Sequence, residues 1–379
     1  MDGEQENEDR AIRLLRLQTH NIPHSVYGVH LSGTGKILSN YTEAKHDRTC
    51  FVHYPPLKES DLPKGVEIVR RNWLVEQKRV APAVDVVEYI SPTWKEVATR
   101  VVVFKYYFLL PFAAGNWNEM NVWMRLPPHP NIARFDSVVT DESKTLVVGF
   151  TSYFVSGGTL KDNKSRMFKF HWLQQLMNVA DDLNLKYGIS HQYIAPQNLA
   201  VDERLDCIKL FDFNLAARIH GPLPEEGEIY IQERNDVNGV ELTLYEIITR
   251  DFNFRELPYE DQPNEDLPPV WRNANDLPGE WIQHEDVTLD NSITQFRLAV
   301  QFWKSQRITR EDYKIDKSNQ PEFISWPKRP KPERLADRTS HPDGTKVPTS
   351  IRQYSERRQD VLARNEKGLN WERLPMGGI

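Results

Sequence analysis

Hydrophobic and polar positions follow a regular pattern only in the middle of the chain. The segments 86–90 (VVEYI) and 96–110 (EVATRVVVFKYYFLL) are rich in β-branched and aromatic residues, which is typical of strands. Residues 116–126 (NWNEMNVWMRL) have apolar side chains at helical spacing, and the turn PPHPN ends this helix. Residues 145–155 (TLVVGFTSYFV) predict another buried strand, closed by Ser-Gly-Gly. This part of the chain is therefore expected to be mostly strand.

The pattern changes to helical spacing further along the chain. Residues 166–188 predict a helix, and residues 235–251 (NDVNGVELTLYEIITRD) predict a strongly apolar one. Between them, residues 189–203 and 207–219 read as two short strands flanking a polar loop. One later amphipathic helix is expected at 293–307. The pattern thus indicates an α+β protein in which a strand-rich part precedes a helical part.

The flanking regions carry weaker patterns. We expect residues 1–84 to be an N-terminal extension that is partly disordered, residues 85–310 to be the main domain, and residues 311–379 to be a C-terminal tail rich in proline and charge. The stretch WPKRPKPERLADRTSHPDGTKVPTS from Trp326 is too poor in apolar residues to predict a packed core. An extended Pro-rich backbone can dock in an aromatic groove of a partner, but a solvated tail is the favoured interpretation.

Composition and charge narrow the function classes. Of 379 residues, 39% are hydrophobic and 27% charged, and the net charge of −6 gives no reason to expect a nucleic-acid partner. The N-terminus lacks the features of a signal peptide, and the longest apolar stretch, 101–114, is interrupted by Lys105. Only Cys50 and Cys207 occur, without metal-ligand spacing. We therefore expect an intracellular protein, cytoplasmic or nuclear, without a membrane segment.

Several short motifs follow one another in the central region. Lys105 ends the strand sequence Val-Phe-Lys, and Glu119 lies fourteen residues later on the predicted helix. The turn 129–132 reads His-Pro-Asn-Ile, and residues 153–160 read YFVSGGTL. The polar loop 191–198 reads HQYIAPQN.

Two further motifs complete the series. Residues 212–214 read Asp-Phe-Asn, and Asp236 heads the apolar helix. In this order, the motifs resemble the V-A-I-K, H-R-D-L-x-x-x-N and D-F-G motifs of protein kinases. The resemblance covers roughly residues 85 to 250, and the loop is similar to that of kinase-like proteins from filamentous fungi. Small-molecule phosphotransferases share the H-x-D-x-x-x-x-N pattern. The hinge-like segment 153–160 and the H-P-N-I turn favour the protein-kinase branch instead.

The resemblance implies a fold and a set of site residues. The fold would be a two-lobed protein-kinase-like one, with a β-rich N-lobe and a reduced α-helical C-lobe. ATP would be held by an ion-paired Lys105 and Glu119 and by a hinge at Tyr153 and Val155.

The resemblance also implies a metal site. Mg²⁺ would be held by Asn198 and Asp212, brought together by a short hairpin. The alternative for Asp212 is a structural cap that binds nearby backbone amides.

Several parts that phosphoryl transfer requires are missing. The Gly-rich loop is expected between Tyr89 and Val97, yet no glycine occurs between Gly65 and Gly115. Tyr193 occupies the position of the catalytic aspartate. A phenol keeps its proton at neutral pH and donates a hydrogen bond, so it cannot accept the proton of a substrate hydroxyl.

The cation and the substrate platform of a working kinase are missing too. The positions that carry the loop cation in kinases are Ala195 and Gln197. No Ala-Pro-Glu motif lies between Asp212 and Asp236. We therefore expect a pseudokinase that acts on an unidentified protein partner as a scaffold or regulator, with at most weak binding of ATP and Mg²⁺. The alternative is a weak or unconventional ATP-dependent protein kinase.

Overall fold

The computed structural model forms two compact units. The smaller comprises Met1–Tyr54 with Lys331–Arg373, and the larger comprises Pro55–Pro330 with Leu374–Ile379. Within them the structure describes residues 10–11, 13–23, 25–47, 50–81, 83–90, 99–106, 113–163, 165–219, 230–256, 271–309, 323–330 and 355–365.

The smaller unit combines residues from both extensions of the chain. Its elements are η1 (Thr19–Asn21), β1 (Gly28–Leu31), β2 (Ile37–Tyr41), η2 (Ala44–His46), β3 (Cys50–Val52), β14 (Ser355–Arg357) and α7 (Arg358–Ala363). Strands β1 and β2 form a hairpin, and β3 pairs antiparallel with β14. The buried carboxylate of Asp47 lies 2.7 Å from the guanidinium of Arg358. The two segments that the sequence assigns to an extension and a tail thus form one unit.

The larger unit is built around a six-stranded mixed sheet. Its strands are β4 (Glu67–Arg70), β5 (Val75–Ala81), β6 (Val84–Ile90), β7 (Thr99–Tyr106), β8 (Phe135–Thr140) and β9 (Val147–Tyr153). Their order is β4-β8-β9-β7-β6-β5, with β4 and β8 parallel and the other neighbours antiparallel. Alternating burial of Val102, Phe104 and Tyr106 in β7 follows from the period of two that a strand with one covered face requires.

Helix α2 (Ala113–Arg125) carries buried side chains on several faces. Trp117, Met120 and Trp123 are buried, and Arg125 hydrogen-bonds back to Asn121 in the last turn. The helix contacts the sheet at β8 and, more extensively, the short helix η8 (Phe213–Leu215). This position brings Glu119 toward the sheet.

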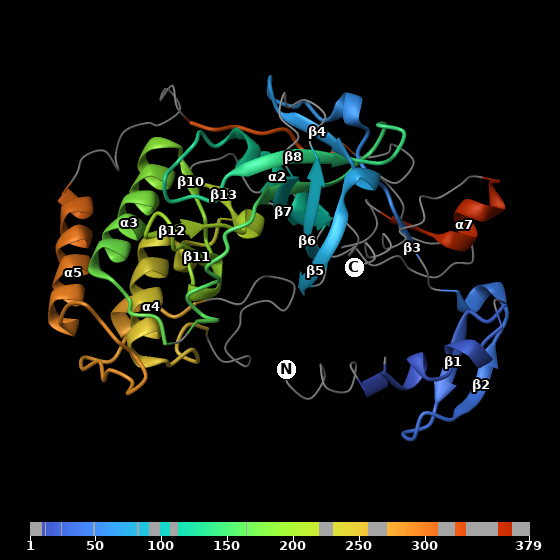
Figure 1. Ribbon diagram of the computed structural model, residues 1–379, viewed down its shortest axis with the longest axis horizontal. Coiled ribbons are helices and arrows are strands. Elements are labelled where there is room, and N and C mark those ends of the chain that lie inside the picture. Colours follow the sequence, from blue (N-terminus) through green and yellow to red (C-terminus); the bar gives the residue numbers. More distant parts are fainter. Residues whose placement is uncertain are drawn as a thin grey trace. The chain divides into compact units, whose positions relative to one another are not determined.

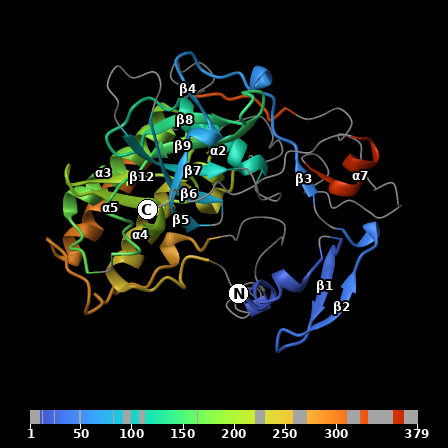
Figure 2. The same ribbon diagram turned by 45° about the vertical axis from the view of Figure 1, so that its right-hand side comes forward.

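Three helices, α3 (Phe170–Asp181), α4 (Asp236–Thr249) and α5 (Ile293–Thr309), form a bundle beyond the sheet. They lie side by side and contact one another (Figures 1 and 2). Helix α3 continues into a π-helical turn, η6 (Asp182–Lys186). Helix α4 begins where the side chain of Asn235 accepts a hydrogen bond from the amide of Asn238, and it is apolar nearly all round because it lies in the middle of this bundle.

Short elements make up the rest of the regular structure described in the larger unit. They are η3 (Leu57–Glu59), η4 (Arg71–Trp73), β10 (Ile189–Ser190), η7 (Pro196–Asn198), β11 (Leu199–Asp202), β12 (Cys207–Leu210), β13 (Ala217–Arg218), η9 (Gln232–Arg234) and η11 (Ala274–Asp276). Strand β11 pairs with β12, and β10 pairs with β13. The hairpin expected between Asn198 and Asp212 is therefore present as β11–β12.

Two segments outside residues 85–310 also pack in the larger unit. Strands β4 and β5 lie in the six-stranded sheet although they precede residue 85, because β5 forms a hairpin with β6. Trp326 is only 7% exposed, which differs from the solvated tail that the composition favours. Composition misses this burial because the packing of one or two aromatic side chains is enough to hold a Pro-rich segment on a surface that other residues form. No helix in the described parts of the chain is both long and apolar enough to cross a bilayer.

Candidate functional site

Three charged side chains that are far apart in the sequence meet between β7, α2 and η8. The ammonium nitrogen Nζ of Lys105 lies 2.6 Å from Oε2 of Glu119 and 2.7 Å from Oδ1 of Asp212. Glu119 is fully buried, whereas the side chains of Lys105 and Asp212 keep 18% and 23% exposure. We call these residues the charged triad. The expected contact between Lys105 and Glu119 is thus present, and the triad adds Asp212 to it.

The two carboxylates of the triad have different environments. Lys105 donates a hydrogen bond to Asp212, whereas the geometry toward Glu119 is that of an ion contact without a hydrogen bond. Burial raises the pKa of Glu119 to about 8, against the attraction of Lys105. Burial would also raise the pKa of Asp212, but Lys105 outweighs it and holds the pKa below its usual value. One ammonium facing two carboxylates thus leaves Glu119 as the group that holds a proton.

Asp212 has a backbone conformation that few residue types adopt. Its φ and ψ are both +67°, in the left-handed region, where Asp and Asn are the best tolerated residues after glycine. It precedes the short helix η8, yet its side chain makes no capping hydrogen bond and faces Lys105 instead. The alternative interpretation of Asp212 as a structural cap is therefore wrong.

An aromatic stack passes beside the triad. The fully buried ring of Phe213 lies 5.5 Å from Trp123 of α2 and 4.7 Å from His191 of the polar loop. Burial lowers the pKa of His191, and the neutral ring donates from Nε2 to the carbonyl of Phe211 while Nδ1 accepts from the amide of Tyr193. The stack joins the helix that carries Glu119 to the loop that carries Tyr193.

The polar loop 191–198 is anchored on helix α4. The buried carboxylate of Asp236 accepts hydrogen bonds from the backbone amides of His191 and Gln192, and from the side chains of Asn184 and Ser190. Four charge-assisted bonds to one carboxylate fix the loop at the N-terminus of the helix, where the helix dipole also favours a negative charge.

Gln192 joins the two ends of the segment that follows Asp212. Its Nε2 donates to the carbonyl of Leu215, and its Oε1 accepts from the amide of Ile231 at 2.5 Å. Residues 220–229, most of the interval in which a working kinase builds its substrate platform, lie outside the described residues. An uncharged amide therefore holds the described ends of this segment together.

The hydroxyl and the ring of Tyr193 both have partners within the fold. Its hydroxyl accepts a hydrogen bond from Gln197, and its ring lies 5.9 Å from the ring of Trp271. The guanidinium of Arg234 lies 5.7 Å from the Tyr193 ring and 4.9 Å from that of Trp271. Tyr193 is thus one wall of a packed aromatic and cationic cluster.

Arg255 closes this cluster from the side of α4. Its guanidinium lies 4.4 Å from the Trp271 ring, makes two hydrogen bonds of 2.7 Å to the carboxylate of Glu246, and donates to the carbonyl of Ile194. No sequence motif contains Trp271 or its two arginines, and they join the cluster only through the fold. We call Tyr193, Arg234, Arg255 and Trp271 the tryptophan cluster.

Asn198 and Asp212 are brought near each other by the backbone. The hairpin β11–β12 lies between them, and the carbonyl of Asn198 accepts from the amide of Phe211 at 3.1 Å. Asn198 is buried and donates its side-chain amide to the carbonyl of Tyr193, so Oδ1 is the atom that it could offer to a cation. Among the described residues, no group of three or more His, Cys, Asp or Glu side chains could hold a metal ion by itself.

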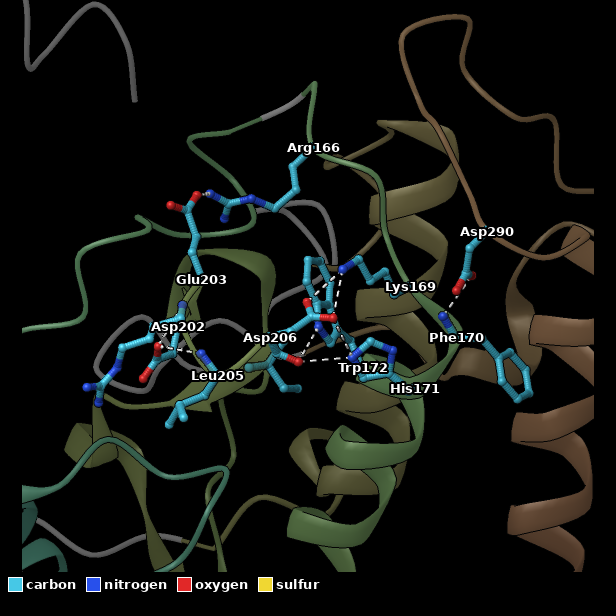
Figure 3. Close-up of polar contacts among 12 residues, drawn as sticks. Arg166, Lys169, Phe170, His171, Trp172, Asp202, Glu203, Leu205, Asp206 and Asp290 are labelled. Carbon is cyan, nitrogen blue, oxygen red and sulfur yellow. Dashed lines mark hydrogen bonds and ion pairs between the residues drawn. The ribbon is translucent and has the colours of Figure 1, made fainter.

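A second polar cluster fixes the turn of this hairpin (Figure 3). Asp206 receives two bonds from Lys169 at 2.7 and 2.8 Å, and its carbonyl accepts from His171 and Trp172 at the start of α3. The hydrogen bond from Lys169 lowers the pKa of Asp206. On the same hairpin, Arg166 pairs with Glu203, as Figure 3 shows. These contacts support the hairpin and bear on the triad only through it.

The hinge residues lie at the end of strand β9, next to the strand of Lys105. Tyr153 pairs with Val102 of β7, donates its amide to the carbonyl of Arg134, and has the Arg134 guanidinium 5.3 Å from its ring. Val155 follows it, and both side chains are partly exposed. Their role toward adenine stays a prediction.

The segment in which the Gly-rich loop is expected, between Tyr89 and Val97, follows strand β6, and the loop stays a prediction. Lys105 lies on the third strand of the meander β5-β6-β7. Val84 at the start of β6 pairs with Lys105, so the lysine lies level with the end of the β5–β6 hairpin. Residues 91–98 of the expected loop lie outside the described residues.

Comparison with known proteins finds limited similarity to kinases. No protein-family model matches the chain. It is 34% identical over 108 residues to CBL-interacting serine/threonine-protein kinase 5 of Arabidopsis thaliana, and 35% identical over 108 residues to CBL-interacting serine/threonine-protein kinase 14 of the same plant. Each match covers 27% of this chain and 22% or 23% of the relative, so the chain spans less than a quarter of the length of these relatives. This similarity supports a protein-kinase-like relationship for part of the chain.

Proposed function

We propose that this chain is a degenerate protein-kinase-like protein whose sheet and helical bundle correspond to the two lobes of a kinase. Its charged triad binds a nucleotide weakly, and the protein acts inside the cell as a scaffold or regulator of a protein partner. The observation that carries the proposal is the contrast between two neighbouring sites. The triad is assembled, whereas the position of the catalytic base is Tyr193, packed into the tryptophan cluster.

The triad is chemically suited to a phosphate group bound with Mg²⁺. Two of the three N–H donors of Lys105 face carboxylates, which leaves one for a phosphate oxygen. With Glu119 protonated, the charges of Lys105 and Asp212 cancel, so the triad by itself gives a polyphosphate no net attraction. A divalent cation held by Asp212 and Asn198 would supply the missing positive charge, because Mg²⁺ in such sites uses one or two protein ligands and the substrate phosphates.

Phosphate transfer is not supported by the same residues. The only side chain at the position of the base is a phenol whose hydroxyl is engaged by Gln197. No glycine occurs between Gly65 and Gly115, so a Gly-rich cradle over the phosphates is missing as well. Removing one such electrostatic group costs roughly 10²–10³ in rate in well-studied enzymes, and two are missing here.

The test is a nucleotide-binding measurement on the full chain. We expect ATP with Mg²⁺ to raise the melting temperature, with a stabilisation of about 2.7 kcal/mol at 100 times Kd, and EDTA to abolish the effect. Lys105→Ala should remove the shift. If the alanine variant fails to fold, Lys105→Arg is measured instead, because it keeps the positive charge. The exposed Lys161→Ala is the matched control. No shift with wild-type protein at millimolar ATP would refute nucleotide binding.

A phosphotransfer assay separates the proposal from the enzyme alternative. We expect no transfer from γ-labelled ATP to general protein substrates or to the chain itself. Transfer by the unmodified protein that disappears in Asp212→Asn would show a working, unconventional kinase.

A further inference from the structure

The Pro-rich segment 323–330 runs along the surface of the larger unit from the helical bundle toward the sheet (Figure 1). It is extended throughout, and both Trp326 and Arg329 are buried, at 7% and 5% exposure. Prolines at 327 and 330 favour this extended conformation by fixing φ. The segment has three anchors, one on each of three elements around the charged triad.

The first anchor lies at the end of the π-helical turn that follows α3. The amide of Ile324 donates to the carbonyl of Tyr187 at 3.2 Å. The ring of Phe323 lies so close to Gly188 that a Cβ there would be 3.0 Å from ring atoms. Gly188 has a φ of +70°, so glycine serves both the backbone conformation and the close approach.

The second anchor lies on the segment that leads away from Asp212. Arg218 of strand β13 donates from Nη2 to the carbonyl of Trp326 at 2.8 Å. Its guanidinium also lies 3.9 Å from the centroid of the Trp326 ring, a close cation–π contact. Because Trp326 is buried, this contact is shielded from water.

The third anchor lies on the helix that carries Glu119. The indole nitrogen of Trp117 in α2 donates to the carbonyl of Pro327 at 3.1 Å. Trp117 is 1% exposed, so its N–H depends on this acceptor, and it precedes Glu119 by half a turn of helix. A shift of the segment at Pro327 would therefore move α2 and with it the carboxylate of Glu119.

We propose that residues 323–330 form a strap that positions α2, and with it Glu119, against Lys105. The strap ties α2 to the segment after Asp212, so it holds both carboxylates of the triad from outside. Trp326, Arg218 and Trp117 are positioning residues, since none of them belongs to the triad. The consequence for ligands rests on the proposed function: a nucleotide that needs the assembled triad tightens the strap, and the strap raises its affinity by the same factor.

The test measures amide hydrogen exchange and nucleotide affinity in the full chain. In Trp326→Ala we expect the amides of α2 to exchange at least tenfold faster, which corresponds to about 1.4 kcal/mol in the opening free energy. The amides of α4 should keep their rates and thus report global stability. Trp326→Phe retains an aromatic ring over Arg218 and should recover most of the protection.

The matched control is Trp281→Ala. Trp281 is also 7% exposed and lies 4.9 Å from an arginine guanidinium, that of Arg297, but its ring packs on Tyr245 of α4. We expect this variant to leave the exchange of α2 at its wild-type rate. If Trp326→Ala does not fold, Arg218→Lys weakens the same anchor, because an ammonium cannot reproduce the planar stacking of a guanidinium.

The outcomes separate the strap from the proposed function. Equal acceleration in α2 and α4, or none in α2, overturns the strap whether or not ATP binds. Selective acceleration in α2 supports it. If wild-type protein fails to bind ATP with Mg²⁺, the proposed function fails while the exchange data still decide the strap. If it binds, Trp326→Ala should weaken binding about tenfold and Trp281→Ala should not.

Discussion

The protonation of Glu119 predicts an unusual dependence of stability on pH. Burial raises the pKa of this carboxyl from 4.5 to about 8, so the folded protein binds the proton more tightly than the unfolded chain does. The stabilisation that this group contributes is therefore complete below the unfolded value of 4.5 and is lost as the pH rises through the folded value of about 8. The perturbation that isolates it is Glu119→Gln, which keeps the size of the side chain and leaves the contact between Lys105 and Asp212 in place.

The expected magnitude follows from proton linkage. Between the two pKa values, the folded state holds one proton that the unfolded state has released, and each pH unit lowers the free energy of unfolding by about 1.4 kcal/mol. From pH 5.5 to pH 7.5 the wild-type protein should thus lose about 2.7 kcal/mol relative to Glu119→Gln. The difference should level off above about pH 9, where the carboxyl is ionised in both states.

The assay is urea denaturation of both proteins at pH 5.5, 7.5 and 9. Subtracting the two free energies of unfolding at each pH cancels the contributions of all other titrating groups. A difference that stays constant, or that changes in favour of the wild type as the pH rises, would refute the reasoning. It would mean that the attraction of Lys105 at 2.6 Å outweighs burial and that Glu119 is ionised.

Three further variants test other parts of the site. Tyr193→Asp alone should give no phosphate transfer from labelled ATP, because the new carboxylate would lie beside the guanidinium of Arg234 and pair with it; measurable transfer would contradict this. Arg255→Met should lower the free energy of unfolding in urea by about 3–5 kcal/mol by leaving Glu246 buried without its partner, whereas replacing both should recover most of the loss. Asp236→Asn should cost roughly 2–4 kcal/mol in the same assay, because an amide cannot accept all four hydrogen bonds of the carboxylate; an unchanged midpoint would show that the loop does not depend on this anchor.

Local patterns predicted the elements around the triad well. The helix that carries Glu119 and the strand that ends near Lys105 were expected where α2 and β7 lie. The hairpin between Asn198 and Asp212 was also expected from two short apolar runs. These features depend on periodicity and on turn residues, which are properties of short stretches.

Features that depend on distant contacts could not be predicted in the same way. The sheet begins at β4 because Glu67 and its neighbours pair with β8, some seventy residues later. The burial of Trp271 and of Trp326 results from arginines elsewhere in the fold, and no spacing rule connects them.

The two buried charge clusters differ in how fully the chain pairs their charges. The carboxylate of Glu246 receives two hydrogen bonds from Arg255, whose remaining donors reach Ile194 and Thr243. That cluster is satisfied by the chain itself, as a structural ion pair must be. In the triad, by contrast, one ammonium faces two carboxylates, and the contact of Lys105 with Glu119 lacks hydrogen-bond geometry.

Such an arrangement costs free energy that an apolar replacement of similar size would avoid. A buried cluster that is under-satisfied and has a strongly shifted pKa is typical of a binding site. Tyr193 is not under-satisfied in this way, because its hydroxyl and its ring both have partners within the chain. The contrast between the triad and Tyr193 therefore supports the proposal that this chain binds a nucleotide without catalysing its transfer.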